Sequence, residues 1–150
     1  MQEPPPVSRA RLHGNRPAIR EGGRDFTYAE LLDASARVAA SLLAGRPDLE
    51  EARVAFMAPA GFAYTAVQWG IWRAGGIAIP LSVHATPPEL HHALGDSDVE
   101  AIVVSREHLS HVEGQGRRML LSDDAMQGET APLPEISPDR RAMILYTSGT

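Results

Sequence analysis

Residues 53–81 read RVAFMAPAGFAYTAVQWGIWRAGGIAIPL, and this stretch decides the fold. It opens with a short, mostly apolar run, Arg53–Ala58, which ends at Pro59 and predicts a strand. An apolar segment over residues 61–74 follows and predicts a helix that is buried on most sides. Two glycines end that helix, and Ile77–Leu81 predicts a second strand. A strand, a helix and a strand in this order are typical of a parallel sheet.

The same stretch could also be read as a membrane span, because it carries no charge from Val54 to Trp72. Pro59 and Gly61 interrupt it, however, and leucine and isoleucine, which favour insertion into a bilayer, are nearly absent. We therefore expect a buried strand followed by a buried helix, and no membrane span.

Further strands and helices alternate on both sides of this unit. Ala101–Val104 and Met119–Leu121 predict two more strands. Two Thr-x-x-Glu capping boxes, at Thr27 and Thr86, predict the starts of two helices. Unbroken apolar strands that alternate with helices are typical of parallel strands covered on both faces. The sequence thus predicts an α/β fold with a mostly parallel sheet and helices on both faces.

The remaining segments complete the expected organisation. Residues 1–17 carry several prolines and arginines without periodicity, so we expect an irregular lead-in before a domain that spans residues 18–150. That domain starts with a short hairpin over residues 18–27, with glycines in its turn. Residues 122–138 predict a polar connector, and Ala142–Tyr146 predicts a final strand.

Composition and charge exclude several classes of function. The chain has 150 residues, which suits one domain, and its formal net charge of -5 offers no basic surface for nucleic-acid phosphates. It contains no cysteine, which excludes disulfides, thiolate metal sites and cysteine nucleophiles. It also contains no lysine, which excludes Schiff-base chemistry and a lysine-containing Walker A loop. The N-terminus lacks the basic start and apolar run of a secretory leader, so we expect a cytoplasmic protein.

The candidate binding site lies at the end of the predicted final strand, in Thr147, Ser148, Gly149 and Thr150. In open parallel sheets, ligands bind outside the carboxyl ends of the strands. Hydroxyl groups, a glycine that lets the backbone approach closely, and successive backbone N–H groups suit the phosphates of a nucleotide. The alternative interpretation is a polar turn that only ends a strand. No residue of the chain is predicted to be catalytic.

Histidines provide the other candidate sites. His108 and His111 lie three residues apart on a predicted short helix and could share a metal ion, but no third ligand is near them, so we expect no metal site. His84 follows a strand and could line a cleft, although local polar packing is the favoured interpretation. Of His91 and His92, we expect one to be packed and the other solvated, because adjacent helix positions point in different directions.

The order of these segments resembles the acyl-CoA synthetases of the adenylate-forming superfamily, which also contains luciferases and the adenylation domains of peptide synthetases. The phosphate loop of that superfamily reads Tyr/Phe-Thr-Ser-Gly-Ser/Thr-Thr-Gly-x-Pro-Lys-Gly after an apolar strand, and residues 142–150 read AMILYTSGT. The other landmarks that match in order are Asp25–Leu31, Arg53–Phe56, Gly70–Leu81, Glu89–Leu90 and Gly95–Ser97. The resemblance spans residues 18–150. The stretches FMAP, QWGIW and PLSVH most resemble malonyl- or methylmalonyl-CoA synthetases.

This resemblance implies the N-terminal subdomain of the large domain of an AMP-forming acid–CoA ligase. Such an enzyme uses ATP, Mg²⁺ and coenzyme A. A carboxylate attacks the α-phosphorus of ATP, pyrophosphate leaves, and the thiol of coenzyme A captures the acyl-adenylate. Thr147, Ser148, Gly149 and Thr150 would hold the β- and γ-phosphates. The implied substrate is a small carboxylic acid, with malonate or a related acid as the narrower match.

The sequence stops within the matched loop. The loop lysine, the Mg²⁺-binding glutamate and the C-terminal domain with its catalytic lysine have no counterpart in it. We therefore expect an inactive fragment that binds none of these cofactors tightly and whose partner is the remainder of the same polypeptide. Two alternatives stay open. One is another adenylate-forming enzyme, such as a fatty acid or aryl acid–CoA ligase or a peptide-synthetase adenylation domain, and the other is a catalytically silent α/β binding module.

Overall fold

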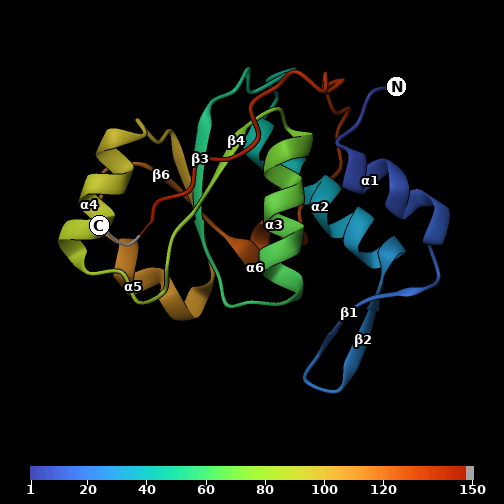
Figure 1. Cartoon of the computed structure of the whole chain (residues 1–150), viewed down its shortest axis with the longest axis horizontal. Coiled ribbons are helices and arrows are strands. Elements are labelled where there is room, and N and C mark those ends of the chain that lie inside the picture. The colour runs from blue at the N-terminus through green and yellow to red at the C-terminus, as the bar shows by residue number, and fades with distance from the viewer. Residues whose placement is uncertain (148–150) are drawn as a thin grey trace.

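The computed structural model of the chain describes residues 1–147. Its centre is a four-stranded sheet (Figure 1), in which the strands follow the order β4-β3-β5-β6. All three strand pairings in this sheet are parallel, so the predicted α/β class is confirmed. The strands are β3 (Arg53–Met57), β4 (Ile77–Pro80), β5 (Ala101–Val104) and β6 (Arg118–Leu121).

Helices cover both faces of the sheet. The helices and 3-10 turns are α1 (Pro5–Ala10), η1 (Arg11–His13), α2 (Tyr28–Leu43), α3 (Phe62–Arg73), α4 (Pro87–Asp96), η2 (Arg106–His108), α5 (Leu109–Val112) and α6 (Ser122–Met126). Along β3, Val54 and Phe56 pack toward α2 and α3, whereas Ala55 and Met57 pack toward α4. Figure 1 shows these two helical layers on opposite sides of the sheet. Because β3 is covered on both sides, its apolar residues are consecutive in the sequence.

The local signals in the sequence correspond to real elements. Both capping boxes are formed: the Thr27 and Thr86 hydroxyls accept from the third backbone N–H of α2 and α4. The predicted hairpin consists of β1 (Pro17–Glu21) and β2 (Arg24–Thr27), which pair antiparallel. The uncharged stretch from Val54 to Trp72 forms most of β3 and α3. Within residues 1–147, no helix has the length and apolar character needed to cross a membrane.

The expectation of an irregular lead-in over residues 1–17 is wrong, because this segment contains α1 and η1. Prolines in the first turn of α1 fix the backbone angle that a helix needs and remove N–H groups that would lack partners there. Val7 and Ala10 are buried against Leu31 of α2 and Trp69 of α3. The helix is therefore stabilised by tertiary packing, which a short aperiodic sequence does not reveal.

Two other segments differ from their predicted forms. Residues 122–138 begin with α6, because Ala125 is buried in the core beneath α2. The predicted final strand, Ala142–Tyr146, forms only one parallel bridge, between Met143 and Ala78 of β4. The next donor on this side of β4 would be the N–H of Pro80, which proline lacks, so the ladder stops there.

Helices α2 and α3 pack closely at Gly70. A Cβ atom added there would lie 2.5 Å from Val38 Cγ1 and 3.0 Å from the Ser35 carbonyl oxygen. Arg73, nearly one turn along α3, is buried and donates hydrogen bonds to the Leu32 carbonyl and the Ser35 hydroxyl. A glycine and one buried guanidinium thus set the distance between the two helices.

Gly70→Ala should destabilise the protein by about 1–3 kcal/mol, because the added methyl group overlaps Val38 and the α2 backbone. Gly95→Ala is the matched control, since Gly95 is also helical but no atom lies within 4 Å of an added Cβ. That change should stabilise the protein by about 0.5–1 kcal/mol. Urea unfolding of both variants and the wild type measures the difference. Equal stability of Gly70→Ala and wild type would show that α2 and α3 can separate without cost.

Candidate functional site

The segment that leads to Thr147 runs along the outer edge of β4. The N–H of Ala78 donates to the Ala142 carbonyl at 2.8 Å, and the N–H of Ile144 donates to the Ala78 carbonyl at 3.0 Å. Residues 145–147 then leave the sheet on its carboxyl side. Thr147 therefore lies at the carboxyl ends of the strands, which is where ligands bind in parallel folds.

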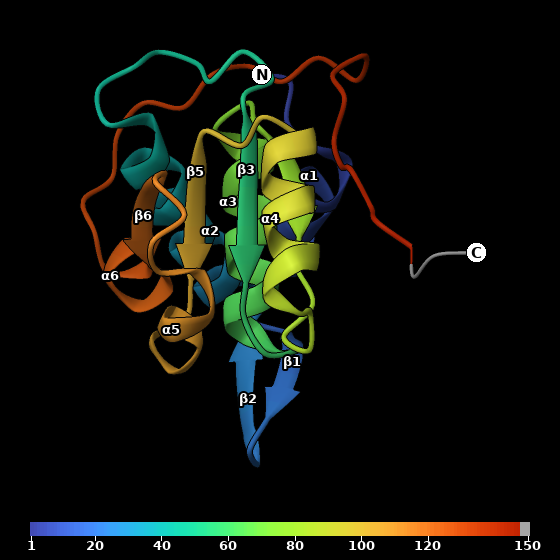
Figure 2. The same ribbon diagram turned by 90° about the vertical axis from the view of Figure 1, so that its left-hand side faces the viewer.

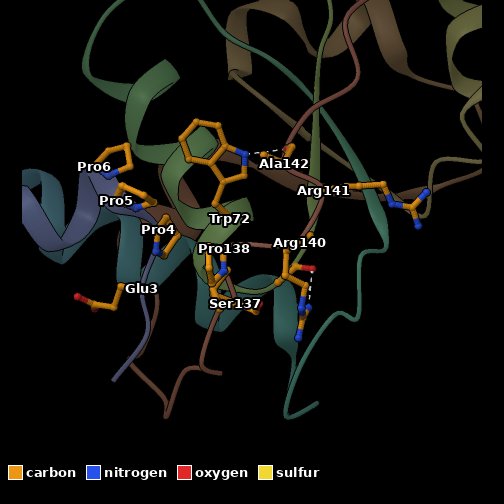
Figure 3. A pocket seen from close by; sticks show the side chains of 13 residues that line it. Glu3, Pro4, Pro5, Pro6, Trp72, Ser137, Pro138, Arg140, Arg141 and Ala142 are labelled. Atoms are coloured by element: carbon orange, nitrogen blue, oxygen red, sulfur yellow. Dashed lines mark hydrogen bonds between the residues drawn. The ribbon is translucent and has the colours of Figure 1, made fainter.

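Trp72 holds the start of this segment. Its indole N–H donates to the Ala142 carbonyl at 2.7 Å, so that this oxygen accepts from both Trp72 and Ala78. Figure 3 shows the bond at the wall of a mostly apolar cavity of about 210 Å³, whose other walls include Pro4, Pro5, Pro6 and Pro138. Gly75 and Gly76, which precede β4, also line this cavity, and it therefore lies at the amino end of the sheet, away from Thr147.

Two ion pairs fix the residues just before Ala142. Arg140 donates to both carboxylate oxygens of Asp48. Arg141 binds Glu51 through its backbone N–H, at 2.9 Å, and through its guanidinium, at 2.7 Å. These hydrogen bonds lower the pKa of the Asp48 and Glu51 carboxyl groups below their ordinary values. The approach to Thr147 is therefore tied to the loop that precedes β3.

A second cavity, here called the loop-side cavity, lies beside Thr147 at the carboxyl end of β4. Its volume is about 340 Å³, and its polar lining consists of Ser82, His84, Glu89, His92, Tyr146 and Thr147. The Glu89 carboxylate is already engaged, because it accepts the Thr86 N–H at 2.7 Å in the capping box of α4. Hydroxyl and imidazole groups make up the rest of the polar lining and can donate hydrogen bonds to an anion, whereas the Glu89 carboxylate keeps its negative charge at one wall.

Of the predicted phosphate-binding residues, Thr147 alone falls within the described part of the chain, and Ser148, Gly149 and Thr150 lie outside it. Thr147 is exposed at the rim of the loop-side cavity. Its position at the carboxyl end of the sheet is the one expected from the sequence. Phosphate binding by these four residues stays a prediction.

The histidines are arranged differently from what the sequence suggested. His84 lines the loop-side cavity, although local polar packing was the favoured interpretation. His91 and His92 are both exposed, so the expectation that one is packed was wrong. The buried face of α4 consists of Leu90, Ala93 and Leu94, which leaves both histidines outside it. His92 lines the loop-side cavity next to Tyr146, whose ring it contacts edge-on, and no spacing in the sequence shows that contact.

The rings of His108 and His111 lie 5.4 Å apart, between centroids. Within residues 1–147, no group of three or more His, Cys, Asp or Glu side chains is arranged to hold a metal ion. This pair therefore has no additional ligand in the described part of the chain.

The sheet has one more place where an anion could bind, the point between β3 and β5 at which the strand order reverses. There Glu21 of the hairpin accepts a hydrogen bond at 3.1 Å from the N–H of Phe62, the first residue of α3. A Cβ atom added at Gly61 would overlap the same carboxylate oxygen, so the side chain of Glu21 packs directly against the loop. A carboxylate at this helix N-terminus occupies the position in which other parallel folds bind phosphate. The hairpin thus closes this position to anions, and the loop-side cavity remains the better candidate.

Comparison with known proteins gives a family match and a structural match. The profile of the family described as "AMP-binding enzyme" matches residues 7–150. The chain is similar to the feruloyl-CoA synthase of an Amycolatopsis species, with 36% identity over 152 residues that cover 97% of the chain and 30% of that protein. It is also similar to a malonate–CoA ligase of Mus musculus, with 32% identity over 161 residues that cover 97% of the chain and 28% of that protein. The chain therefore spans less than a third of the length of these curated relatives.

Among solved structures, the fold is similar to the N-terminal subdomain of NpsA from Klebsiella oxytoca, with a TM-score of 0.80. The match covers 97% of this chain and 38% of that chain at 18% sequence identity. At this identity the likeness concerns the fold, and it confirms the expected N-terminal subdomain architecture.

Trp72→Phe tests how the segment before Thr147 is held. The change keeps an aromatic ring in the apolar cavity but removes the N–H that binds the Ala142 carbonyl. We expect a loss of about 1 kcal/mol in the free energy of unfolding and faster amide hydrogen exchange at Ile144. Trp69→Phe is the control, since Trp69 packs on α1 and α2 and its replacement should not act selectively on Ile144. Unchanged exchange at Ile144 in Trp72→Phe would contradict this anchoring role.

Proposed function

The chain belongs to the AMP-binding enzyme family, and on that premise we propose that it is the N-terminal part of an ATP-dependent, AMP-forming acid–CoA ligase. One observation carries the proposal. The segment bonded to Ala78 brings Thr147 to the carboxyl end of the sheet, beside a cavity lined by hydroxyl and imidazole groups. This combination suits the polyphosphate of a nucleotide.

The proposed reaction has two steps. A carboxylate oxygen attacks the α-phosphorus of ATP, the bond from that phosphorus to the oxygen bridging to the β-phosphorus breaks, and pyrophosphate leaves. The sulfur of coenzyme A then attacks the acyl carbon, and AMP leaves. In this scheme Thr147 and the three residues after it donate hydrogen bonds to the β- and γ-phosphates, which stabilises the charge that develops on the leaving pyrophosphate.

The described residues fit a bound polyphosphate. Thr147 is exposed, and Ser82, His84 and His92 line the cavity next to it. Residues 1–147 offer no cluster for Mg²⁺, so we assign its ligands, together with the coenzyme A surface, to the remainder of the polypeptide. The greater length of the relatives supports this assignment.

We also propose that the AMP-binding domain begins before residue 18, because Val7 and Ala10 of α1 are part of the same packed unit as α2 and α3. The expected lead-in is then an integral layer of that domain. A cytoplasmic location stays a prediction.

For the acid, we propose malonate or a related small carboxylate. The similarity to the malonate–CoA ligase of Mus musculus supports this choice, as do the stretches FMAP, QWGIW and PLSVH. An aromatic acid is the second candidate, because the chain is also similar to a feruloyl-CoA synthase. ATP–pyrophosphate exchange by the complete protein with each acid distinguishes the two. Exchange with neither of these, nor with fatty acids, other aryl acids or amino acids, would favour a catalytically silent binding module.

Two substitutions in the complete protein test the phosphate loop. Ser148→Ala removes one hydroxyl donor, and Gly149→Val blocks close approach of the backbone. Each should slow adenylation by roughly 10²–10³-fold, the effect of losing one oxyanion-type donor. The melting temperature without nucleotide should change little, because the helical layers lie elsewhere. Ser8→Ala, on α1, is the control for loss of an exposed serine hydroxyl. Near-normal adenylation by Ser148→Ala would identify the segment as an ordinary turn.

The chain of residues 1–150 alone should not exchange pyrophosphate into ATP. It contains no lysine to neutralise the leaving pyrophosphate, and a charge at that position stabilises the transition state by several kcal/mol. Exchange measured with the purified chain checks this. Robust exchange would show that arginine and backbone donors in this chain suffice.

A further inference from the structure

We propose that Tyr146 is the positioning residue of the phosphate loop, because its side chain ties the backbone just before Thr147 to the C-terminal end of α4. The effect on nucleotide binding rests on the proposed function, whereas the contact itself does not. We call this contact the Tyr146 latch.

The latch lies where the sheet stops holding the segment. Among the described residues, the last backbone hydrogen bond of the segment is that from Ile144 to Ala78. Leu145 is 66% exposed and contributes no buried side chain. The ring of Tyr146 instead lies edge-on to the ring of His92, with centroids 6.2 Å apart. Tyr146 is thus the last side chain before Thr147 that is packed on a regular element.

The Tyr146 hydroxyl is bound at three points. It contacts the Asp96 carboxylate at 2.7 Å, the Ala93 carbonyl at 3.4 Å and the Ser97 hydroxyl. A phenol has one proton to donate, and Asp96 and Ala93 present only acceptor atoms here. The proton therefore goes to the nearer oxygen, that of Asp96, and the Ser97 hydroxyl donates to Tyr146. A hydrogen bond from a hydroxyl to a carboxylate is among the stronger ones in proteins.

Helix α4 is a firm support for this contact. Its first turn is closed by the Thr86–Glu89 capping box, and Leu90, Ala93 and Leu94 are buried in the core. The Tyr146 phenol is protonated near neutral pH even at its ordinary pKa and can therefore donate, and burial raises that pKa further. Helix α4 therefore holds the backbone at Tyr146 in place, directly before the phosphate loop.

This arrangement has a specific kinetic consequence. A loop whose start is already fixed loses less conformational entropy when ATP binds than a loop that is free. Once ATP is bound, its phosphates order the loop in either case. Loss of the latch should therefore raise the KM for ATP and leave kcat nearly unchanged. A role of the ring in packing alone predicts no change when only the hydroxyl is removed.

Tyr146→Phe in the complete enzyme is the direct test, since it keeps the ring and removes the hydroxyl. We expect the KM for ATP to rise about tenfold, with kcat within about twofold of wild type. Tyr64→Phe is the matched control, because the Tyr64 ring packs on Phe56 far from α4, and its KM should be that of wild type.

Changes at Asp96 test the same contact from its other side. Asp96→Asn retains an acceptor oxygen and should keep a KM near that of wild type. Asp96→Ala should raise the KM for ATP as much as Tyr146→Phe does. The double variant should show no further increase in KM, because both changes remove the same hydrogen bond. If Tyr146→Phe fails to fold, Asp96→Ala gives the decisive value. A KM for ATP within twofold of wild type in Asp96→Ala, or in Tyr146→Phe if it folds, would overturn the proposed role of the Tyr146 latch.

A measurement on the 150-residue chain separates the latch from the proposed function. Backbone ¹⁵N order parameters of Leu145–Thr147 should lie near 0.8 in the wild type and in Tyr64→Phe, and below about 0.6 in Tyr146→Phe. If the complete protein forms no acyl-adenylate with any acid, the proposed function fails while this measurement still decides on the contact. Equal order parameters in Tyr146→Phe and wild type overturn the latch.

Discussion

Parallel strands can be joined only through crossovers, and in this protein the crossovers carry helices that cover the two faces of the sheet. Helix α3 connects β3 to β4 on one face, and α4 connects β4 to β5 on the other. The strands are therefore left with apolar residues on both sides, and polar side chains collect where the strands end. Ser82 and His84 follow β4 for this reason, and they face the same cavity as Thr147. The candidate site thus lies at the end of β4 because helices cover both faces of the sheet and leave only the strand ends open to polar side chains.

The sequence reveals the parts of the fold that local physics determines. The four strands are visible because burial on both faces makes their apolar residues consecutive, and α2 and α4 are visible because Thr27 and Thr86 cap them. Helix α1 is not visible, since its stability comes from contacts of Val7 and Ala10 with distant helices. The same holds for the site. Thr147 could be placed from the segment before it, whereas no spacing predicts that His92 of α4 and Tyr146 contact each other at the same cavity.

Two features of the structure favour the edge of β4 over the centre of the sheet as the place for a nucleotide. The hairpin carboxylate of Glu21 occupies the N-terminus of α3, where the strand order reverses. The cavity of about 520 Å³ beside it is lined by the carboxylates of Glu21, Glu107 and Asp123 and by one cation, Arg106, so that negative charge predominates there. At the edge of β4, the loop-side cavity is lined by a single carboxylate, that of Glu89, which is hydrogen-bonded in a helix cap. Of the two cavities, the loop-side cavity therefore carries the smaller negative charge.

Pro80 has a further consequence during synthesis of the chain. Figure 2 shows the connector after α6 crossing back over the top of the molecule before it descends beside α4. Because this connector is made after β6 and α6, β3 to β6 can assemble while the outer edge of β4 is still uncovered. An uncovered strand edge is a template on which other chains can aggregate. On this edge only Ala78 has an N–H to offer, since Pro80 has none. The residue that shortens the final bridge to one pair thus also makes the unfinished sheet a poor nucleus for aggregation.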